Sequence, residues 1–331
     1  MRISVLGAGS WGTTVAALVS RRHEAVVWAR EPALAQEISH RHHNPVYLPG
    51  FSLPERLRAT GDAGLAAARA QVLIVGVPSH AFREVLESVR GRVEPWIPIV
   101  SLAKGLEHGS LLRMTEVIGQ VLPGHPVAAL TGPNLAKEIL AGQAAATVVA
   151  TPDQVVAKLL QEIFQHGLLR VYTNDDVIGC ELGGALKNVI AIAAGMAQGL
   201  GVGDNTRAAV ITRGLAELTQ LGVAMGGRAA TFAGLTGLGD LMATCVSPQS
   251  RNRHVGEQLG RGRELDDVLA GMVQVAEGVR AAPAAVELGD RYGLPMPICR
   301  TISQVLSGEI TVHDAYRGLR HTPAGHEAGP W

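Results

Sequence analysis

Three glycines near the amino terminus have the spacing of a loop that binds phosphates. Gly7, Gly9 and Gly12 follow an apolar, strand-like run, residues 3–6, and precede a helix-like stretch, residues 13–20. In a βαβ unit the first glycine permits the tight turn, the second lets a pyrophosphate approach the backbone, and the third lets the helix pack on the strand. The helix N-terminus adds N–H groups and the positive end of its dipole. The pattern predicts a dinucleotide site, with an ordinary glycine turn as the alternative.

Lys187 is the side chain with the strongest case for acid–base chemistry. On a helix, it would share its face with small or apolar residues and with no carboxylate: Cys180, Gly183, Gly184, Ile190, Ala191 and Ala194. If this face lines a cleft, desolvation lowers the pKa of the lysine and suits it to proton transfer. The alternative is a lysine whose stem covers apolar neighbours while its ammonium reaches solvent. Asn188, next along the chain, is placed to orient a hydroxyl or carbonyl group.

A glycine-rich turn and a helix start form a second group of polar residues. Asp240 and Thr244 lie in residues 237–244, and Ser250, Arg251 and Asn252 follow shortly after. A serine hydroxyl, a guanidinium and an amide at a helix N-terminus can bind a phosphate. Simple capping of the helix by Ser250 explains the same residues equally well. Asp240 either caps the helix after it or holds a polar group of a substrate.

Arg30 and Glu31 follow the second strand-like run, residues 25–28. At this place, enzymes that use NAD commonly carry an acid for the ribose hydroxyl, and enzymes that use NADP carry an arginine for the 2′-phosphate. Because Arg30 comes first and Pro32 follows Glu31, we favour NADPH over NADH as the cofactor. A surface arginine without a ligand is the alternative.

Three histidines, His40, His42 and His43, raise the question of a metal site. No aspartate or cysteine accompanies them at ligand spacing. We therefore expect a solvated helix end at these residues and no bound metal.

The first half of the chain alternates apolar strand-like runs with helical segments. The further runs are residues 72–75, 97–102, 127–130 and 146–150, and the helical segments include residues 81–89 and 111–121. Near-continuous apolar strands that alternate with helices predict a parallel sheet covered on both faces. Ligands of such sheets bind beyond the carboxyl ends of the strands. The turns at residues 77–79, 103–105 and 131–134 are therefore where we expect binding residues.

The second half shows helical periodicity and few strand signals. The helices we predict are residues 177–200, 206–221, 232–242, 252–259, 266–270, 279–292 and 297–307. Residues 172–175 are interpreted as a polar connector between two domains. We therefore predict a dinucleotide-binding domain in residues 1–175, a helical domain in residues 176–320, and a loose tail in residues 321–331.

Composition describes a globular protein without a strong charge. Of the 331 residues, 47% are hydrophobic and 18% charged, and 29 basic residues balance 29 acidic ones, so we expect no nucleic-acid partner. Cys180, Cys245 and Cys299 lie far apart, which favours a reduced intracellular protein without disulfides. The first twenty residues are needed for the βαβ unit, and no run is long and apolar enough to span a bilayer. We expect a cytoplasmic protein with no integral membrane association.

Seven motifs, in order, resemble those of the bacterial NAD(P)-dependent glycerol-3-phosphate dehydrogenases. They lie at residues 7–12, 44–50, 101–107, 132–138, 181–188, 234–241 and 250–252, and the resemblance extends from Arg2 to Arg320. It implies a Rossmann-type parallel-sheet domain followed by an all-α domain similar to that of 6-phosphogluconate dehydrogenase. It also implies reversible reduction of dihydroxyacetone phosphate to sn-glycerol 3-phosphate with NADPH or NADH, for phospholipid synthesis. A homodimer stays open.

The resemblance also carries residue roles onto matching positions. Lys187 is implied as proton donor and acceptor, and we place Asp240 and Asn188 with it in the catalytic group. The substrate residues that we predict are Lys104, Gly132, Asn134, Lys187, Asp240, Thr244, Ser250, Arg251 and Asn252. The cofactor residues that we predict are Gly7, Gly9, Ser10, Trp11, Gly12, Arg30, Tyr47, Lys104, Ala136, Arg251, Val275 and Glu277. Asn134 departs from the family, because many members carry serine there.

Two other functions compete with this interpretation. A β-hydroxyacid dehydrogenase of the 6-phosphogluconate type pairs similar domains, but its lysine and asparagine lie further apart than the adjacent Lys187 and Asn188. A nicotinamide-binding sensor would bind the cofactor without turnover. Nothing in the sequence is typical of a DNA-reading or docking module.

Overall fold

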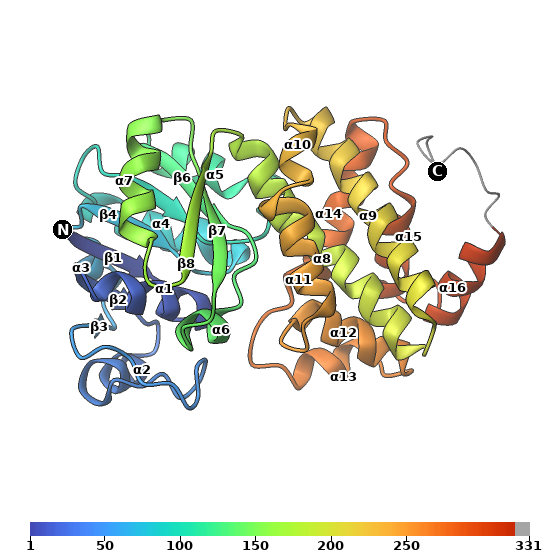
Figure 1. The fold of residues 1–331 in the computed structure, drawn as a ribbon, viewed down its shortest axis with the longest axis horizontal. Helices are drawn as coiled ribbons and strands as arrows, with labels where there is room; N and C mark the ends of the chain where they lie inside the picture. The colour runs from blue at the N-terminus through green and yellow to red at the C-terminus, as the bar shows by residue number, and fades with distance from the viewer. Residues whose placement is uncertain (322–331) are drawn as a thin grey trace. The chain divides into compact units, whose positions relative to one another are not determined.

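The computed structural model describes residues 1–321 and contains two compact units, Met1–Glu181 and a second that begins at Leu182 (Figure 1). The division falls inside helix α8 (Val177–Gly199). The domain boundary at residues 175 and 176 stays a prediction. Of the predicted tail, His321 ends helix α16 (Val312–His321), and residues 322–331 lie outside the described residues.

One eight-stranded sheet forms the centre of the first unit. Its strand order is β3-β2-β1-β4-β5-β6-β7-β8, and its first six positions follow the order 3-2-1-4-5-6 of dinucleotide-binding folds. The strands are β1 (Arg2–Leu6), β2 (Glu24–Trp28), β3 (Arg58–Thr60), β4 (Val72–Val75), β5 (Ile99–Ser101), β6 (Val127–Thr131), β7 (Ala145–Ala150) and β8 (Leu169–Asn174). The predicted sheet domain is confirmed. Its ligand crevice is expected where β1 and β4 adjoin, because the strand order reverses there.

The expectation of a wholly parallel sheet is wrong at one place. Strand β7 pairs with β6 in antiparallel register, with Ala129 opposite Ala150 and Thr131 opposite Val148. The connection, residues 132–144, includes helix α6 (Ala136–Leu140), which contacts α1 (Ser10–Ser20), and the chain returns from the same end of the sheet. A parallel pair needs a crossover back to the opposite end.

Two strands escaped prediction because their residues are polar. Strand β3 begins with an exposed arginine, and β8 is an edge strand with alternating burial that ends in the polar residues 172–174. The interpretation of residues 172–175 as a connector is therefore wrong for all but its last residue. A half-exposed edge strand needs no continuous apolar run.

Side chains of successive strand residues enter two apolar cores on opposite faces of the sheet. Val72 and Ile74 of β4 belong to one core, and Leu73 and Val75 belong to the other, as the two-residue period of a strand requires. The first core is covered by α1 and α7 (Gln154–Phe164), and the second by α3 (Ala63–Ala67), α4 (Phe82–Val89) and α5 (Met114–Val121) (Figure 1). The chain also forms the short α2 (Pro32–Gln36) after β2.

Helices make up the second unit, as predicted. They are α9 (Asp204–Ala224), α10 (Ala229–Phe232), α11 (Asp240–Val246), α12 (Arg251–Gly260), α13 (Leu265–Ala270), α14 (Glu277–Arg291), α15 (Pro297–Leu306) and α16, together with most of α8. Gly195 on α8 and Gly256 on α12 let the two helix backbones approach, since a Cβ on either would lie 2.1 or 2.0 Å from a carbonyl oxygen of the other helix. The sequence did not predict α16.

The single helix predicted for residues 232–242 is broken in the structure. Helix α10 ends at Phe232, a π-helical turn covers Leu235–Gly239, and α11 begins at Asp240. A Cβ on Gly237 would lie 2.0 Å from the carbonyl oxygen of Phe232, so the turn needs a glycine there. Such π turns are frequent at functional sites.

Two segments are long and apolar enough, by length and composition alone, to cross a bilayer: Val177–Gly199 and Ala229–Val246. The expectation that no segment reaches this limit is wrong by that measure. In Val177–Gly199, however, 89% of the apolar window is buried by the protein itself, as in a core helix. In Ala229–Val246, which contains α10, the π turn and α11, 44% is buried.

Candidate active site

The three glycines of the first unit have the geometry that their spacing predicts. Gly7 has a φ of +116°, and a Cβ there would lie 2.8 Å from the carbonyl group of Gly76, next to β4. A Cβ on Gly12 would lie 2.1 Å from the Gly7 oxygen. At Gly9 no heavy atom lies within 4 Å of that position, so the backbone faces open space. A tight turn, close helix packing and an open approach occur together where β1 adjoins β4.

Helix α1 begins directly at this open space. Gly9 is its N-cap and supplies no side chain to bond the first N–H groups. The indole Nε1 of Trp11 is buried and has no hydrogen-bond partner among residues 1–321. Thr14 Oγ1 lies 3.5 Å from the carbonyl oxygen of Ala136, which brings the start of α6 beside α1. An uncapped helix start with an unpaired donor beside an open glycine fits the pyrophosphate of a dinucleotide.

Arg30 lies on the surface at the end of β2. Its side chain is 80% exposed, and its Nη2 pairs with Glu31 Oε1 at 2.8 Å. Exposure of this side chain agrees with both interpretations of Arg30, a contact to a 2′-phosphate and a plain surface arginine. An exposed guanidinium paired with a neighbouring carboxylate stays accessible to a phosphate. Tyr47, the other predicted residue of this region, packs against the core under α1.

Lys104 and Gly132 meet where two neighbouring strands end. Lys104 follows β5, Gly132 follows β6, and the ammonium Nζ of Lys104 donates to the Gly132 carbonyl oxygen at 2.6 Å. Gly132 has a φ of +117°, which glycine adopts without strain. The parallel pairing of β5 and β6 brings these two predicted residues together.

Asn134 has a buried side-chain amide with unused hydrogen-bonding capacity. Its side-chain nitrogen and oxygen are both buried, and neither has a hydrogen-bond partner within residues 1–321. The hydroxyl of Thr131 is likewise buried and has no hydrogen-bond partner within these residues. A buried polar group without a partner costs about 1–3 kcal/mol, so these atoms are expected to bond a ligand or water. Thr131 was not predicted as a binding residue, although the turn at residues 131–134 was.

Lys187 is buried in the second unit. It is 4% exposed, and its Nζ lies 2.5 Å from Asp240 Oδ1 and 2.5 Å from Thr244 Oγ1. The alternative of a lysine that reaches solvent is therefore wrong. Its carboxylate partner comes from α11, and for this reason the spacing along α8 showed none.

The π turn before α11 positions this partner. A Cβ on Gly183 of α8 would lie 2.7 Å from the Thr236 carbonyl oxygen, so the turn packs directly on the helix that carries the lysine. Thr244 donates its hydroxyl to the Asp240 carbonyl oxygen at 2.6 Å and is thereby oriented toward Lys187. Burial raises the pKa of the nearby Cys245 thiol to about 12, with Lys187 opposing the shift and Asp240 adding to it. The thiol stays protonated beside this ion pair.

Asn188 and Asn252 are bonded to one another. Asn252 Nδ2 donates to Asn188 Oδ1 at 2.8 Å, and Asn252 Oδ1 accepts from the Gly278 N–H at 2.9 Å. These two hydrogen bonds link α8, α12 and α14. Both amides thus have a structural task in addition to the catalytic and substrate roles that we predicted for them.

Ser250 and Arg251 form the start of α12. The Ser250 hydroxyl accepts from the Arg253 N–H at 3.2 Å, so the capping that we kept as an alternative is present. Arg251 Nη1 donates to the Val275 carbonyl oxygen at 2.7 Å. Desolvation lowers the pKa of Arg251 and Glu277 raises it, but a guanidinium keeps its charge in either case. Four predicted residues, Ser250, Arg251, Val275 and Glu277, therefore lie together.

A buried carboxylate holds the start of helix α8 within the first unit. Glu181 accepts from Arg113 Nη1 at 2.8 Å and from the Thr115 N–H at 2.9 Å. Burial raises the pKa of Glu181, and these partners oppose the rise. Glu181 lies in a motif that we singled out, but Arg113, 68 positions away, carried no signal of pairing with it.

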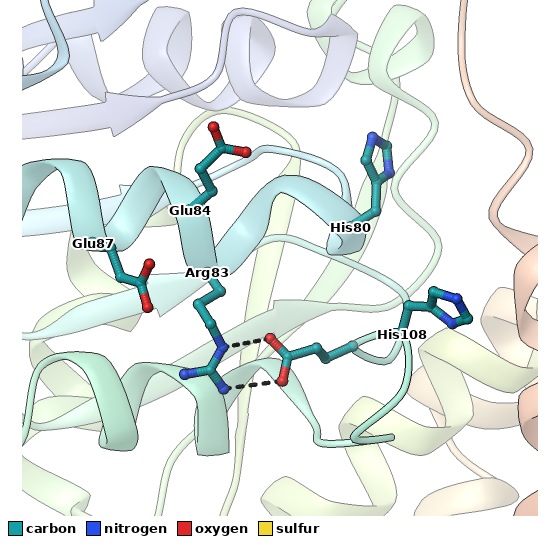
Figure 2. A pocket seen from close by; sticks show the side chains of 6 residues that line it. His80, Arg83, Glu84, Glu87 and His108 are labelled. Carbon is teal, nitrogen blue, oxygen red and sulfur yellow. Dashed lines mark hydrogen bonds and ion pairs between the residues drawn. The ribbon is translucent and has the colours of Figure 1, made fainter.

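A hollow elsewhere in the first unit contains none of the predicted residues (Figure 2). It is lined by His80, Arg83, Glu84, Glu87, Glu107 and His108. Arg83 Nε and Nη2 donate to the two carboxylate oxygens of Glu107 at 2.7 and 3.0 Å, and Arg83 lowers the pKa of that carboxyl. Arg83 and Glu107 are thus bound to one another, and the residues that we predicted for the reaction lie elsewhere.

The three histidines lie at the end of a π-helical turn, Glu37–Arg41. His42 ends the turn in the left-handed conformation, and His43 Nδ1 lies 3.1 Å from the Phe51 carbonyl oxygen. Among residues 1–321 no group of three or more His, Cys, Asp or Glu side chains could hold a metal ion.

Comparison with known proteins matches both halves of the chain. The protein-family model for the N-terminus of NAD-dependent glycerol-3-phosphate dehydrogenase matches residues 2–157, and the family model for its C-terminus matches residues 176–317. The chain is 58% identical over 330 residues to glycerol-3-phosphate dehydrogenase (NAD(P)+) 2 of Sphingopyxis alaskensis, covering 100% of this chain and 99% of that protein. It is 53% identical over 327 residues to glycerol-3-phosphate dehydrogenase (NAD(P)+) 1 of Mycobacterium tuberculosis, covering 98% and 96%.

A solved structure agrees with these relatives. The crystal structure of glycerol-3-phosphate dehydrogenase from Coxiella burnetii has a TM-score of 0.92 to this chain at 36% identity, covering 97% of this chain and 99% of that one. Because models of both halves match in order and relatives share more than half of their residues along the whole length, this chain belongs to the NAD-dependent glycerol-3-phosphate dehydrogenase family.

Proposed function

We propose that this chain reversibly reduces dihydroxyacetone phosphate to sn-glycerol 3-phosphate with NADPH or NADH, and that Lys187 supplies the proton. The observation that carries the assignment of Lys187 is its buried contact with Asp240 and Thr244. A charged lysine is rarely buried unless it is paired, and a buried lysine with a specific charge partner is a candidate for a functional group.

The proton has to reach an oxygen that gains charge. The nicotinamide, when bound, supplies a hydride to the C2 carbonyl carbon of the substrate. The carbonyl oxygen then becomes an alkoxide, which a neighbouring cation stabilises and protonates. Lys187 provides the cation and the proton at one atom, Nζ. Asp240 and Thr244 hold that atom in place, and a positioned general acid contributes about 10²- to 10⁴-fold to a rate.

In the second unit, we assign the substrate phosphate to the start of α12. Arg251 supplies a guanidinium and the helix N-terminus supplies N–H groups, both of which favour a dianion. Binding energy from a phosphate that does not react orients the carbonyl for reaction. Val275 and Glu277 lie beside Arg251 and keep their predicted cofactor role as part of the proposal.

In the first unit, the proposal assigns the dinucleotide to the glycine turn and the start of α1. The open space at Gly9 and the buried, unpaired Nε1 of Trp11 support it. Lys104, Gly132 and Asn134 are assigned to the substrate, and the unpaired amide of Asn134 supports that assignment. Many members of the family carry serine at this position, and asparagine, like serine, offers both a donor and an acceptor.

The proposal also covers cofactor preference, location and membrane association. We propose NADPH as the preferred cofactor, because the exposed guanidinium of Arg30 is accessible to a 2′-phosphate. A cytoplasmic location is supported by three buried cysteines, Cys180, Cys245 and Cys299, none of which forms a disulfide within the described residues. Absence of integral membrane association is supported by the burial of Val177–Gly199, the more apolar of the two candidate segments.

The experiment is a substrate comparison with the purified protein. Loss of NADPH absorbance, and separately of NADH absorbance, is followed after addition of dihydroxyacetone phosphate or of unphosphorylated dihydroxyacetone. We expect turnover with the phosphate ester and far slower turnover without it. Cofactor binding without any turnover would support the sensor instead. Reduction of NADP+ by 6-phosphogluconate would support the other dehydrogenase class.

A further inference from the structure

Asn44 is a fully buried amide that contacts the glycine turn from behind. It is 0% exposed, and its Nδ2 donates to the Ala8 carbonyl oxygen at 2.9 Å and to Thr13 Oγ1 at 2.9 Å. Its Oδ1 accepts from the Tyr47 N–H at 3.0 Å, which fixes the orientation of the amide. All polar atoms of this side chain are therefore used within the first unit.

The Ala8 carbonyl oxygen is the point on which these bonds converge. It accepts from Asn44 Nδ2 and also from the Thr13 hydroxyl, at 3.1 Å. Thr13 is 0% exposed, so the oxygen lies among buried donors on the protein side of the turn. Two donors on one carbonyl strongly limit rotation of its peptide plane.

The same peptide plane contains the N–H of Gly9. In a trans peptide the carbonyl oxygen and the following N–H point in opposite directions. With the Ala8 oxygen held toward Asn44 and Thr13, the Gly9 N–H points away from them. At Gly9 nothing lies within 4 Å of the side-chain position, so the turn is open there to a ligand.

We propose that Asn44 is a positioning residue for the cofactor: it fixes the Ala8–Gly9 peptide so that the Gly9 N–H is directed at the pyrophosphate. This rests on the proposed use of NADPH or NADH by the chain. Asn44 does not touch the cofactor itself. A peptide oriented in advance binds an anion without the cost of reorientation, which is the benefit of preorganised N–H donors.

The bond to Tyr47 allows a second explanation, in which Asn44 merely tethers residues 44–47. The variants Asn44→Asp and Asn44→Ala separate the two. Aspartate keeps an acceptor for the Tyr47 N–H but loses the amide N–H group that donates to the Ala8 oxygen and to Thr13 Oγ1. Thr13→Val removes a donor to Ala8 without adding charge, and Thr13→Ser keeps the hydroxyl.

Ser39→Ala is the matched control. Ser39 Oγ donates to the Ala59 carbonyl oxygen at 3.0 Å and accepts from the Ala59 N–H at 2.7 Å, in the same unit, and both bonds go to strand β3 instead of the glycine turn. The Ser39→Ala variant therefore loses side-chain-to-backbone hydrogen bonds comparable to those lost in the Asn44 variants. For each variant the measurements are the Kd of NADPH by calorimetry, the thermal midpoint, and the KM for dihydroxyacetone phosphate at saturating NADPH.

We expect both Asn44 variants and Thr13→Val to weaken NADPH about tenfold or more, since a hydrogen bond to a charged group is lost. Thr13→Ser and Ser39→Ala should bind NADPH as the wild type does, and the KM for dihydroxyacetone phosphate should stay within about twofold. Folded Asn44→Asp and Thr13→Val proteins with wild-type NADPH affinity would overturn the proposal, as would an equal loss in Ser39→Ala. If the wild type bound neither cofactor, the proposed function itself would fail.

Discussion

Lys187 Nζ and Asp240 Oδ1 lie 2.5 Å apart, with side chains 5% and 3% exposed. A buried ion pair of this kind is costly to break from one side, because the partner stays behind as an uncompensated charge. The contact thus links stability to catalysis: the group that we assign to proton transfer is also one that the helical unit needs for its fold.

Replacing Lys187 by methionine should therefore lower both activity and stability. We expect kcat to fall at least about 10²-fold through loss of the general acid, and the free energy of unfolding to fall by about 3–5 kcal/mol. Urea unfolding and steady-state kinetics on the same preparation measure the two effects. The pair variant Lys187→Met/Asp240→Asn should recover most of the stability and none of the activity. A recovery of both would contradict the catalytic assignment.

Arg251→Ala should act on substrate binding. Loss of a guanidinium from a phosphate site removes a charge-assisted bond, so the KM for dihydroxyacetone phosphate should rise about tenfold or more. Arg261→Ala, a change at the exposed far end of the same helix, is the control and should leave the KM as it is. An unchanged KM in Arg251→Ala would show that the start of α12 is only a capped helix end.

Arg30→Asp should shift the choice between cofactors. An aspartate repels the 2′-phosphate of NADPH and can accept a bond from the ribose hydroxyl of NADH. The ratio of kcat/KM for NADPH to that for NADH should fall about tenfold or more. Arg41→Asp is a control for net charge, since Arg41 is 74% exposed and also pairs with a glutamate. If the ratio of kcat/KM for NADPH to that for NADH were the same in Arg30→Asp and Arg41→Asp, Arg30 would have no specific role in binding the 2′-phosphate.

Glu217 should make stability depend on pH. Burial raises its pKa above the ordinary value of 4.5, although its carboxylate accepts from the N–H groups of Ile298 and Cys299 at the start of α15. With a raised pKa in the folded state, the carboxyl contributes most stability below about 4.5 and loses it as the pH rises through the folded value. Glutamine cannot titrate and should cost about 1–3 kcal/mol at low pH.

The measurement is the free energy of unfolding of the wild type and of Glu217→Gln across this pH range. The advantage of the wild type should shrink as the pH rises above 4.5. Other carboxyls with shifted pKa values, such as Glu181, are present in both proteins and cancel. An advantage that stays constant or grows with pH would contradict the predicted direction.

Local patterns were enough to predict most of the fold. The glycine spacing led to the correct turn, and the apolar run at Val72–Val75 matches β4 to the residue. The helical second unit followed from its periodicity. Strands β3 and β8 were missed because polar, half-exposed strands lack an apolar signal, and the reversal of β7 was missed because strand direction depends on the path of the connection.

Contacts between distant residues could not be predicted in the same way. Asp240, the partner of Lys187, lies 53 positions further along the chain. A π turn positions it, whereas the apolar periodicity predicted one continuous helix through this turn. The hydrogen bonds that link Asn188 to Asn252 and Asn252 to Gly278 form only when three helices pack together. Asn44 was recognised only as part of a motif, since nothing in its neighbours shows that it contacts Ala8.

The rate of NADPH oxidation on addition of dihydroxyacetone phosphate, compared between the wild type and the stable pair variant Lys187→Met/Asp240→Asn, tests the central claim most directly. We predict rapid oxidation by the wild type, a rate at least about 10²-fold lower in the pair variant, and the same Kd of NADPH in both. A wild type that binds NADPH without oxidising it, or a pair variant that retains the wild-type rate, would contradict the account.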